Sequence, residues 1–136
     1  MTSGRRNADT SLMASMTTAH SAVFDLVICG ATAPGIIAAV RAAREGLQVA
    51  LVATGPKLGG SLLSLGAVET HYRGNRAPLL QEFCDRVRAH YWNRNGADSE
   101  QCRACAGGRM VTFEPHVAEA ILELMVAAEK NVSVWR

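Results

Sequence analysis

The pattern of apolar and polar positions predicts a strand, a helix and a second strand near the start of the folded region. Residues 24–29 form a short, mostly apolar run that ends at Gly30, which is typical of a buried strand in a parallel sheet. Apolar residues then recur at helical spacing from Ile36 to Arg44, and residues 47–52 form a second apolar run. A strand, a helix and a strand within about 30 residues form a βαβ unit, which predicts a parallel sheet.

The middle of the chain has a weaker pattern. Residues 53–75 are rich in glycine and show no sustained period, so we predict a loop with one short helix near Ser61. Apolar positions then share one face of a predicted helix over residues 79–91. Residues 93–108 have no period and are predicted to be irregular.

The last part of the chain predicts a helix followed by a third strand. The helix begins at Pro115, a residue suited to the first helical turn, and Asn131 lies at its end. Residues 132–135 read as a strand. The apolar face of the helix is predicted to contain Val117, Ile121, Leu124, Met125 and Ala128. The whole pattern indicates an α/β fold with a parallel sheet.

Residues 1–23 differ from the rest in composition. They are rich in Ser and Thr, have no apolar period and contain Asp9 as their only acid before Asp25. We predict a disordered N-terminal extension over residues 1–23 and one domain over residues 24–136; an organelle transit peptide is the alternative for the extension.

Charge and hydropathy exclude two classes of partner. Fourteen Lys and Arg residues face twelve Asp and Glu residues, and no block of like charges occurs, so we predict no nucleic-acid partner. The most apolar stretch, residues 22–40, is interrupted by Asp25 and Pro34, so we predict no membrane span. Four cysteines without a recognisable signal peptide favour a reducing compartment, and we expect a cytoplasmic protein.

The cysteines and histidines do not form a recognisable catalytic or metal site. A structural zinc site needs four ligands, and Cys102-x2-Cys105 has no second pair, so we predict loop cysteines and no metal. Cys29 and Cys84 are predicted to be buried as small apolar residues. No catalytic residue is assigned, because each histidine in the folded region is isolated or caps a helix: His71, His90 and His116.

The turn after the first predicted strand has the pattern most indicative of a ligand-binding site. Its sequence is Gly30-Ala31-Thr32-Ala33-Pro34-Gly35, and it follows a strand and opens a helix. In a dinucleotide-binding turn the first glycine permits a tight bend, and the last lets the helix pack on the strand with its amides toward a pyrophosphate. Thr32 occupies the position of the middle glycine, where its Cβ limits the approach of a phosphate.

The end of the second strand lacks the acid that commonly binds a ribose. Ala53 stands at that position. Thr54 can accept one hydroxyl bond, and Lys57 can meet a phosphate; an ordinary polar loop is the alternative reading of both.

Several segments resemble a known family. Residues 24–30, the helix 36–46, Leu58-Gly59-Gly60 and residues 113–119 are similar to FAD-dependent oxidoreductases with the glutathione-reductase type of FAD fold. The resemblance implies a Rossmann-like FAD/NAD(P)-binding domain, with FAD as cofactor, a small-molecule substrate, and the amides of Gly59 and Gly60 near the cofactor. Family members run to several hundred residues. We therefore expect residues 24–136 to be the N-terminal part of such a domain, incomplete at its C-terminus and inactive alone.

Two other functions stay open. A non-catalytic remnant or interaction module that keeps the fold without flavin would explain Ala53 and Thr32. A small NADP-binding oxidoreductase would explain the missing acid together with Lys57. A sheet of three strands leaves an open edge, so we expect the chain to form homo-oligomers.

Overall fold

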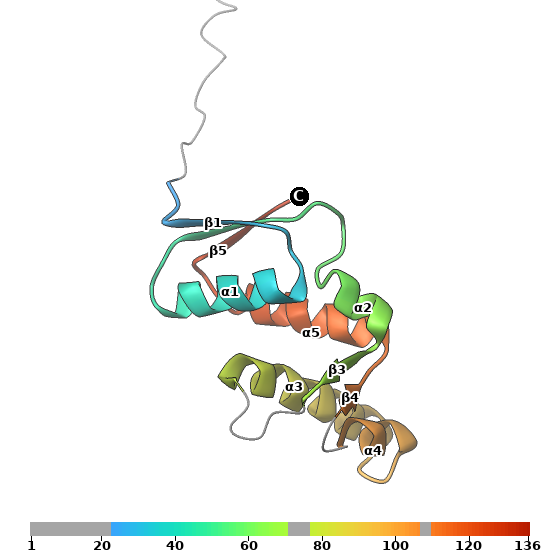
Figure 1. Cartoon of the computed structure of the whole chain (residues 1–136). Coiled ribbons are helices and arrows are strands. Elements are labelled where there is room, and N and C mark those ends of the chain that lie inside the picture. The colour runs from blue at the N-terminus through green and yellow to red at the C-terminus, as the bar shows by residue number, and fades with distance from the viewer. Residues whose placement is uncertain (1–22, 71–76, 107–109) are drawn as a thin grey trace, which may run out of the picture.

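The computed structural model describes residues 23–70, 77–106 and 110–136 (Figure 1). The predicted N-terminal extension, as far as residue 22, and His71 lie outside the described residues. No helix in the described ranges has both the length and the apolar character needed to cross a membrane.

A parallel sheet of three strands forms the first layer. The strands are β1 (Leu26–Cys29), β2 (Val49–Val52) and β5 (Val132–Trp135), in the order β1-β2-β5. Both neighbouring pairs are parallel, with Leu26 opposite Val49 and Val49 opposite Val132. The predicted α/β fold with a parallel sheet is therefore confirmed.

Two helices cover one face of this sheet, as Figure 1 shows. They are α1 (Ala33–Arg44) and α5 (Pro115–Ala127). Their apolar faces and the central strand β2 form the core, in which Ile36, Val40, Leu51 and Met125 have almost no exposed surface. The hydrophobic effect thus holds both helices on the same side of the sheet.

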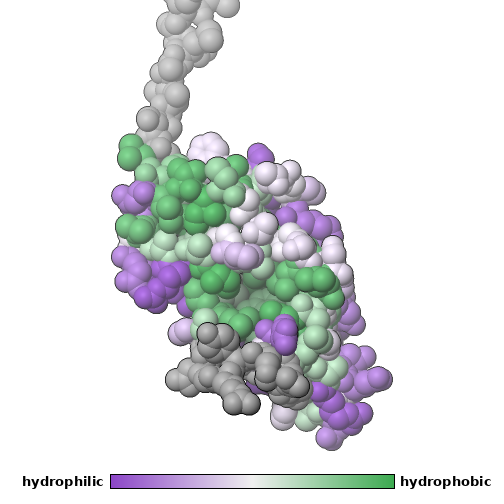
Figure 2. Space-filling model, in the orientation of Figure 1, coloured by the Kyte–Doolittle hydropathy of each residue, from purple (hydrophilic) through white to green (hydrophobic). Residues whose placement is uncertain are grey.

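The other face of the sheet is largely uncovered in the described residues. Val27 of β1 is 56% exposed and Trp135 of β5 is 53% exposed, and the ring of Phe24 packs edge-on against Trp135 at 6.1 Å. Figure 2 shows apolar side chains gathered at this end of the molecule. The prediction that β1 and Cys29 are buried is wrong, because helices cover only one side of this edge strand.

A second group of elements, the lower group, lies mostly on the side of α1 and α5 that faces away from the sheet, with α2 beside α5 (Figure 1). It consists of α2 (Ser61–Leu65), β3 (Ala67–Glu69), α3 (Pro78–Asn95), α4 (Glu100–Ala106) and β4 (Met110–Thr112), with β3 and β4 paired antiparallel. The short helix near Ser61 and the long helix α3 were predicted. The β3–β4 pair was not, because strands of three residues are too short to show a period.

The prediction of an irregular stretch over residues 93–108 is wrong in two respects. Its first residues extend α3, and residues 100–106 form α4. Cys102 and Cys105 lie on one face of α4 and are 4% and 0% exposed, so they are core residues and not loop cysteines. Two residues predicted on the apolar face of α5 are exposed: Leu124 is 59% exposed, and Ala128 lies just after the end of the helix. Cys84 is buried as predicted.

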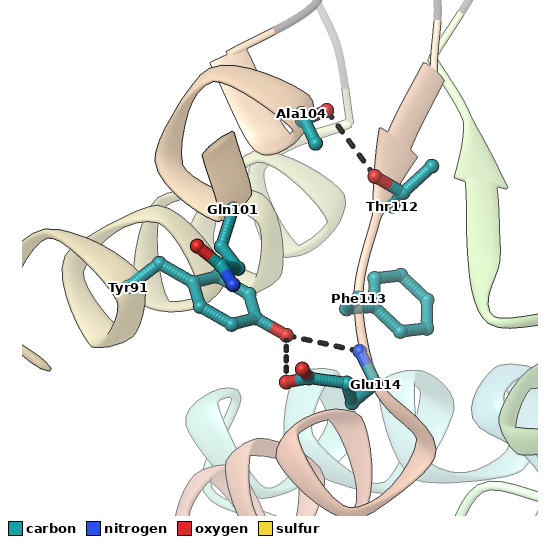
Figure 3. A pocket seen from close by; sticks show the side chains of 6 residues that line it. All are labelled: Tyr91, Gln101, Ala104, Thr112, Phe113 and Glu114. Carbon is teal, nitrogen blue, oxygen red and sulfur yellow. Dashed lines mark hydrogen bonds between the residues drawn. The ribbon is translucent and has the colours of Figure 1, made fainter. Parts of the chain in front are cut away.

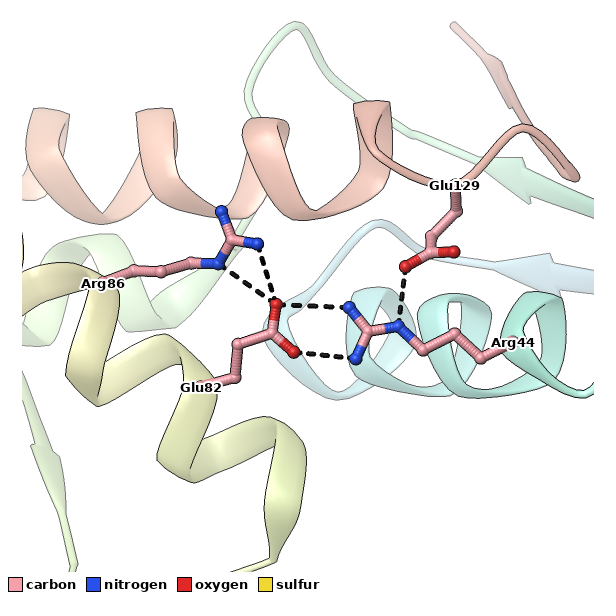
Figure 4. Close-up of polar contacts among 4 residues, drawn as sticks. All are labelled: Arg44, Glu82, Arg86 and Glu129. Carbon is pink, nitrogen blue, oxygen red and sulfur yellow. Dashed lines mark hydrogen bonds and ion pairs between the residues drawn. The ribbon is translucent and has the colours of Figure 1, made fainter.

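A network of charged side chains joins α3 to the ends of α1 and α5 (Figure 4). Arg44 of α1 donates to Glu82 of α3 at 2.7 Å and to Glu129, just after α5, at 2.7 Å, and Arg86 also pairs with Glu82. The hydrogen bonds that Arg44 donates to Glu82 raise the pKa of Arg44 above its usual value and lower the pKa of Glu82 below its usual value. The network aligns α3 with the ends of α1 and α5.

A buried tyrosine holds the start of α5 against α3 (Figure 3). Tyr91 is 3% exposed; its hydroxyl donates to Glu114 Oε2 at 2.7 Å and accepts the Glu114 backbone N–H at 2.9 Å. Glu114 is the residue before the first turn of α5. Burial raises the pKa of Tyr91 to about 12.

We expect Tyr91→Phe to lower the free energy of unfolding by about 1–2 kcal/mol, because both hydrogen bonds are lost. The folded pKa of Tyr91 lies above the ordinary value of 10.0, so its contribution is complete below about pH 10 and is lost as the pH rises toward about 12. The difference in the free energy of unfolding between wild type and Tyr91→Phe should therefore become smaller as the pH rises from about 10 to about 12. Urea unfolding at about pH 8 and about pH 11 measures this change.

Thr112→Val is a suitable control, because Thr112 donates only one longer bond, to the Ala104 carbonyl at 3.3 Å. Its effect should be within about 0.5 kcal/mol and independent of pH over the same window. If Tyr91→Phe lowers the free energy of unfolding equally at both pH values, the Tyr91 hydroxyl does not titrate as described.

Candidate functional site

A cavity of about 240 Å³ lies where β1 and β2 end and α1 begins. Its walls come from the turn between β1 and α1 and from the loop after β2. The lining residues are Ala31, Thr32, Thr54, Gly55, Pro56, Lys57 and Gly60. The carboxyl ends of parallel strands are where ligands bind in open α/β sheets.

Two glycines allow the turn to form and the helix to approach the strand. Gly30 has φ +107°, in the region that favours glycine, and its N–H donates to the Val52 carbonyl at 2.8 Å. A Cβ on Gly35 would lie 2.2 Å from the carbonyl oxygen of Gly30. No side chain fits there, so the first turn of α1 packs directly on the end of β1.

Thr32 caps α1. Its backbone is extended, its Oγ1 accepts the Gly35 N–H at 3.4 Å, and its carbonyl accepts the Ile36 N–H at 2.8 Å. Ala33 donates to the Gly59 carbonyl at 3.2 Å, and Pro34 has no N–H. Thr32 and Gly59, which lie outside the helix, therefore satisfy the first-turn donors of α1.

The loop after β2 packs against this cap. The Gly59 N–H donates to the Ala31 carbonyl at 2.8 Å, so that Gly59 and Thr32 form a parallel bridge. Gly60 has φ +59°, and a Cβ there would lie 3.1 Å from Thr32 Cγ2. Within the described ranges, the amides of Thr32 and Gly60 donate to no protein acceptor, and both residues line the cavity.

Among the described residues that line the cavity, Lys57 is the one cation. Lys57 is exposed, and its Nζ lies 3.1 Å from Glu119 Oε2 on α5. Thr54 is exposed and presents the hydroxyl nearest the end of β2 among the lining residues. Ala53 is 8% exposed and belongs to the hydrophobic core, and its N–H donates to the Trp135 carbonyl at 2.7 Å.

The structure brings together part of the predicted set. Ala31, Thr32, Thr54, Lys57 and Gly60 line the cavity. The other predicted residues shape the turn or lie behind the lining: Gly30, Ala33, Pro34, Gly35, Ala53 and Gly59. Sequence reasoning missed the turn pair Gly55-Pro56, although Gly-Pro is itself a turn signal.

Comparison with protein families agrees with this geometry. A family model described as FAD dependent oxidoreductase matches residues 25–136. The chain belongs to the FAD dependent oxidoreductase family. A search of curated proteins finds no match. The family match spans the sheet, both covering helices and the lower group of elements.

Part of the cavity lining fits a phosphate group of FAD, the cofactor that gives the family its name. Gly60 leaves room that a Cβ would fill, the amides of Thr32 and Gly60 are available, and Lys57 adds a positive charge. Amides at a helix N-terminus and glycine loops are typical ligands for the FAD pyrophosphate. The lining after β2 fits a ribose less well, because Thr54 offers a hydroxyl where a carboxylate is usual.

The described residues hold no group of three or more His, Cys, Asp or Glu side chains arranged to bind a metal ion. Cys102 and Cys105 are free thiols. Burial raises the pKa of Cys105, which disfavours its thiolate form.

Proposed function

We propose that the chain provides the adenosine-diphosphate-binding part of an FAD-dependent oxidoreductase acting on a small molecule. The observation that carries this proposal is the glycine-lined cavity at the carboxyl ends of two parallel strands, built by the Gly30–Gly35 contact and the Gly59–Thr32 bridge. The family match supports the same cofactor.

In this proposal each residue has a defined role in binding. The amides of Thr32 and Gly60 donate to the pyrophosphate, Lys57 balances its charge, and Thr54 bonds a ribose hydroxyl. FAD, when bound, supplies the acceptor for a hydride or electrons. The residues of this chain bind and orient the nucleotide half of the cofactor.

The geometry also bears on the NADP alternative. A 2′-phosphate needs an available cation near the end of β2, whereas Lys57 is already paired with Glu119. The ion pair is exposed, so it is weak and a bound phosphate could displace it. Lys57 can therefore serve the FAD pyrophosphate as well as a 2′-phosphate, so the ion pair does not separate the two ligands. FAD is our first choice because the family match names it, and NADP serves as the competing ligand in the test.

We expect calorimetric titration of the chain with FAD to show binding that Gly60→Val weakens at least about tenfold, because the branched side chain would collide with Thr32 and narrow the cavity. Ser61→Val is the control, since Ser61 is exposed and outside the cavity lining. Circular dichroism should show the same helix content in all three proteins.

Two results would contradict the proposal. Binding of NADP but not FAD by the wild-type chain would favour the NADP-binding oxidoreductase. Absence of binding by either nucleotide, with the fold intact, would favour the non-catalytic module.

A further inference from the structure

A second hollow lies between the end of α3 and the start of α5, away from the cavity described above. Its volume is about 120 Å³, below the roughly 300 Å³ at which pockets for drug-sized ligands begin. It is lined by His90, Tyr91, Arg94, Asn95, Glu114 and His116. It shares no lining residue with the proposed nucleotide cavity.

The side chains that meet here are rich in hydrogen-bond donors. His90, Arg94 and Asn95 come from the last two turns of α3, and His116 comes from the first turn of α5. Two imidazoles, a guanidinium and a carboxamide from elements distant in sequence thus converge on one small space. The C-terminal end of α3 and the N-terminal end of α5 carry opposite partial charges, so the side chains determine which ligand is favoured.

Arg94 differs from most arginines that the structure describes. Arg41, Arg44, Arg86, Arg88 and Arg136 each pair with a carboxylate. Within the same described ranges Arg94 pairs with none, as does Arg103. An arginine without a carboxylate, beside two histidines, is suited to bind an external anion.

The one carboxylate in the lining, that of Glu114, makes no ion pair with Arg94 in the described ranges. Oε2 of Glu114 accepts the Tyr91 hydroxyl at 2.7 Å, and the Glu114 backbone N–H is held by the same hydroxyl. This double contact, visible in Figure 3, ties Glu114 to Tyr91. The guanidinium is therefore left available although an acid lies in the same hollow.

We infer that the hollow between α3 and α5 binds a small oxyanion, a carboxylate or inorganic phosphate, through Arg94, Asn95 and the two histidines. Its size admits a single carboxylate or phosphate group and excludes a nucleotide. The site does not depend on FAD binding, because none of its residues lines the nucleotide cavity.

The test is an NMR titration of the ¹⁵N-labelled chain with sodium phosphate and, separately, with sodium acetate at constant ionic strength. We expect saturable shifts at the amides of Asn95 and His116 with at least one of the two anions. Arg94→Gln should weaken this binding about tenfold, since a charge-assisted hydrogen bond is lost. Arg94 is exposed, so the fold should persist.

Arg103→Gln is the matched control, because Arg103 is also exposed and also unpaired in the described ranges. It should leave the affinity unchanged. Phosphate that enters the nucleotide cavity would instead shift Gly59 and Gly60, and those shifts should be the same in Arg94→Gln. The proposal is overturned if neither anion shifts Asn95 and His116, or if both variants weaken binding equally; neither result would bear on FAD.

Discussion

Gly35→Ala is expected to lower the free energy of unfolding by about 3 kcal/mol or to prevent folding. The added Cβ would lie 2.2 Å from the carbonyl oxygen of Gly30, which is a backbone atom and cannot rotate away. Relief requires α1 to move off β1, yet Ile36, the next residue, and Val40, one turn further on, have no exposed surface. Urea unfolding followed by circular dichroism measures the loss.

Gly55→Ala is the control for this experiment. A Cβ on Gly55 meets no atom within 4 Å, and its backbone is not in the region that requires glycine. The free energy of unfolding should change by no more than about 0.5 kcal/mol. If Gly35→Ala unfolds at the same urea concentration as Gly55→Ala, the close approach of α1 to β1 is not a requirement of the fold.

Ala53→Glu is expected to have two opposite effects. It should lower the free energy of unfolding of the FAD-free chain by about 2 kcal/mol, because Ala53 is 8% exposed and lies in the hydrophobic core. It should raise the affinity of the folded chain for FAD about tenfold, because a carboxylate at this strand end accepts hydrogen bonds from the ribose. Urea unfolding and calorimetry measure the two effects separately.

Thr54→Glu is the matched control, since it adds the same charge at an exposed neighbouring residue that lines the cavity. It should leave the free energy of unfolding nearly unchanged. An unchanged stability for Ala53→Glu would show that its side chain leaves the core. An unchanged or lower FAD affinity, with NADP binding to the wild-type chain, would show that the end of β2 does not hold an FAD ribose.

The βαβ unit could be predicted because its signals are local. The apolar runs of β1 and β2, the helical spacing in α1 and the glycines of the turn all reflect contacts made within about 30 residues. The same holds for α5 and β5, where Pro115 opens the helix. The spacing of apolar residues and the residues of the turns are sufficient to predict such elements.

The lower group of elements was harder to predict for a physical reason. Strands β3 and β4 have three residues each, and α4 has seven, so none contains enough repeats to show a period. They are held by packing between elements: α4 contacts α3 and β4, and Phe83 of α3 meets Phe113, the residue after β4, edge-on at 5.5 Å. Contacts of this kind join residues far apart in the sequence, and no local pattern reports them.

The sequence by itself determined the parallel α/β arrangement and the glycine turn, because chain geometry at Gly30 and Gly35 admits few other residues. Only the tertiary structure decided that Ala53 faces the core and that Cys29 is exposed, since helices cover one side of the sheet. It also brought Arg94 and His116 to one hollow. Such convergence depends on how α3 packs against α5, and that packing is set by the whole core.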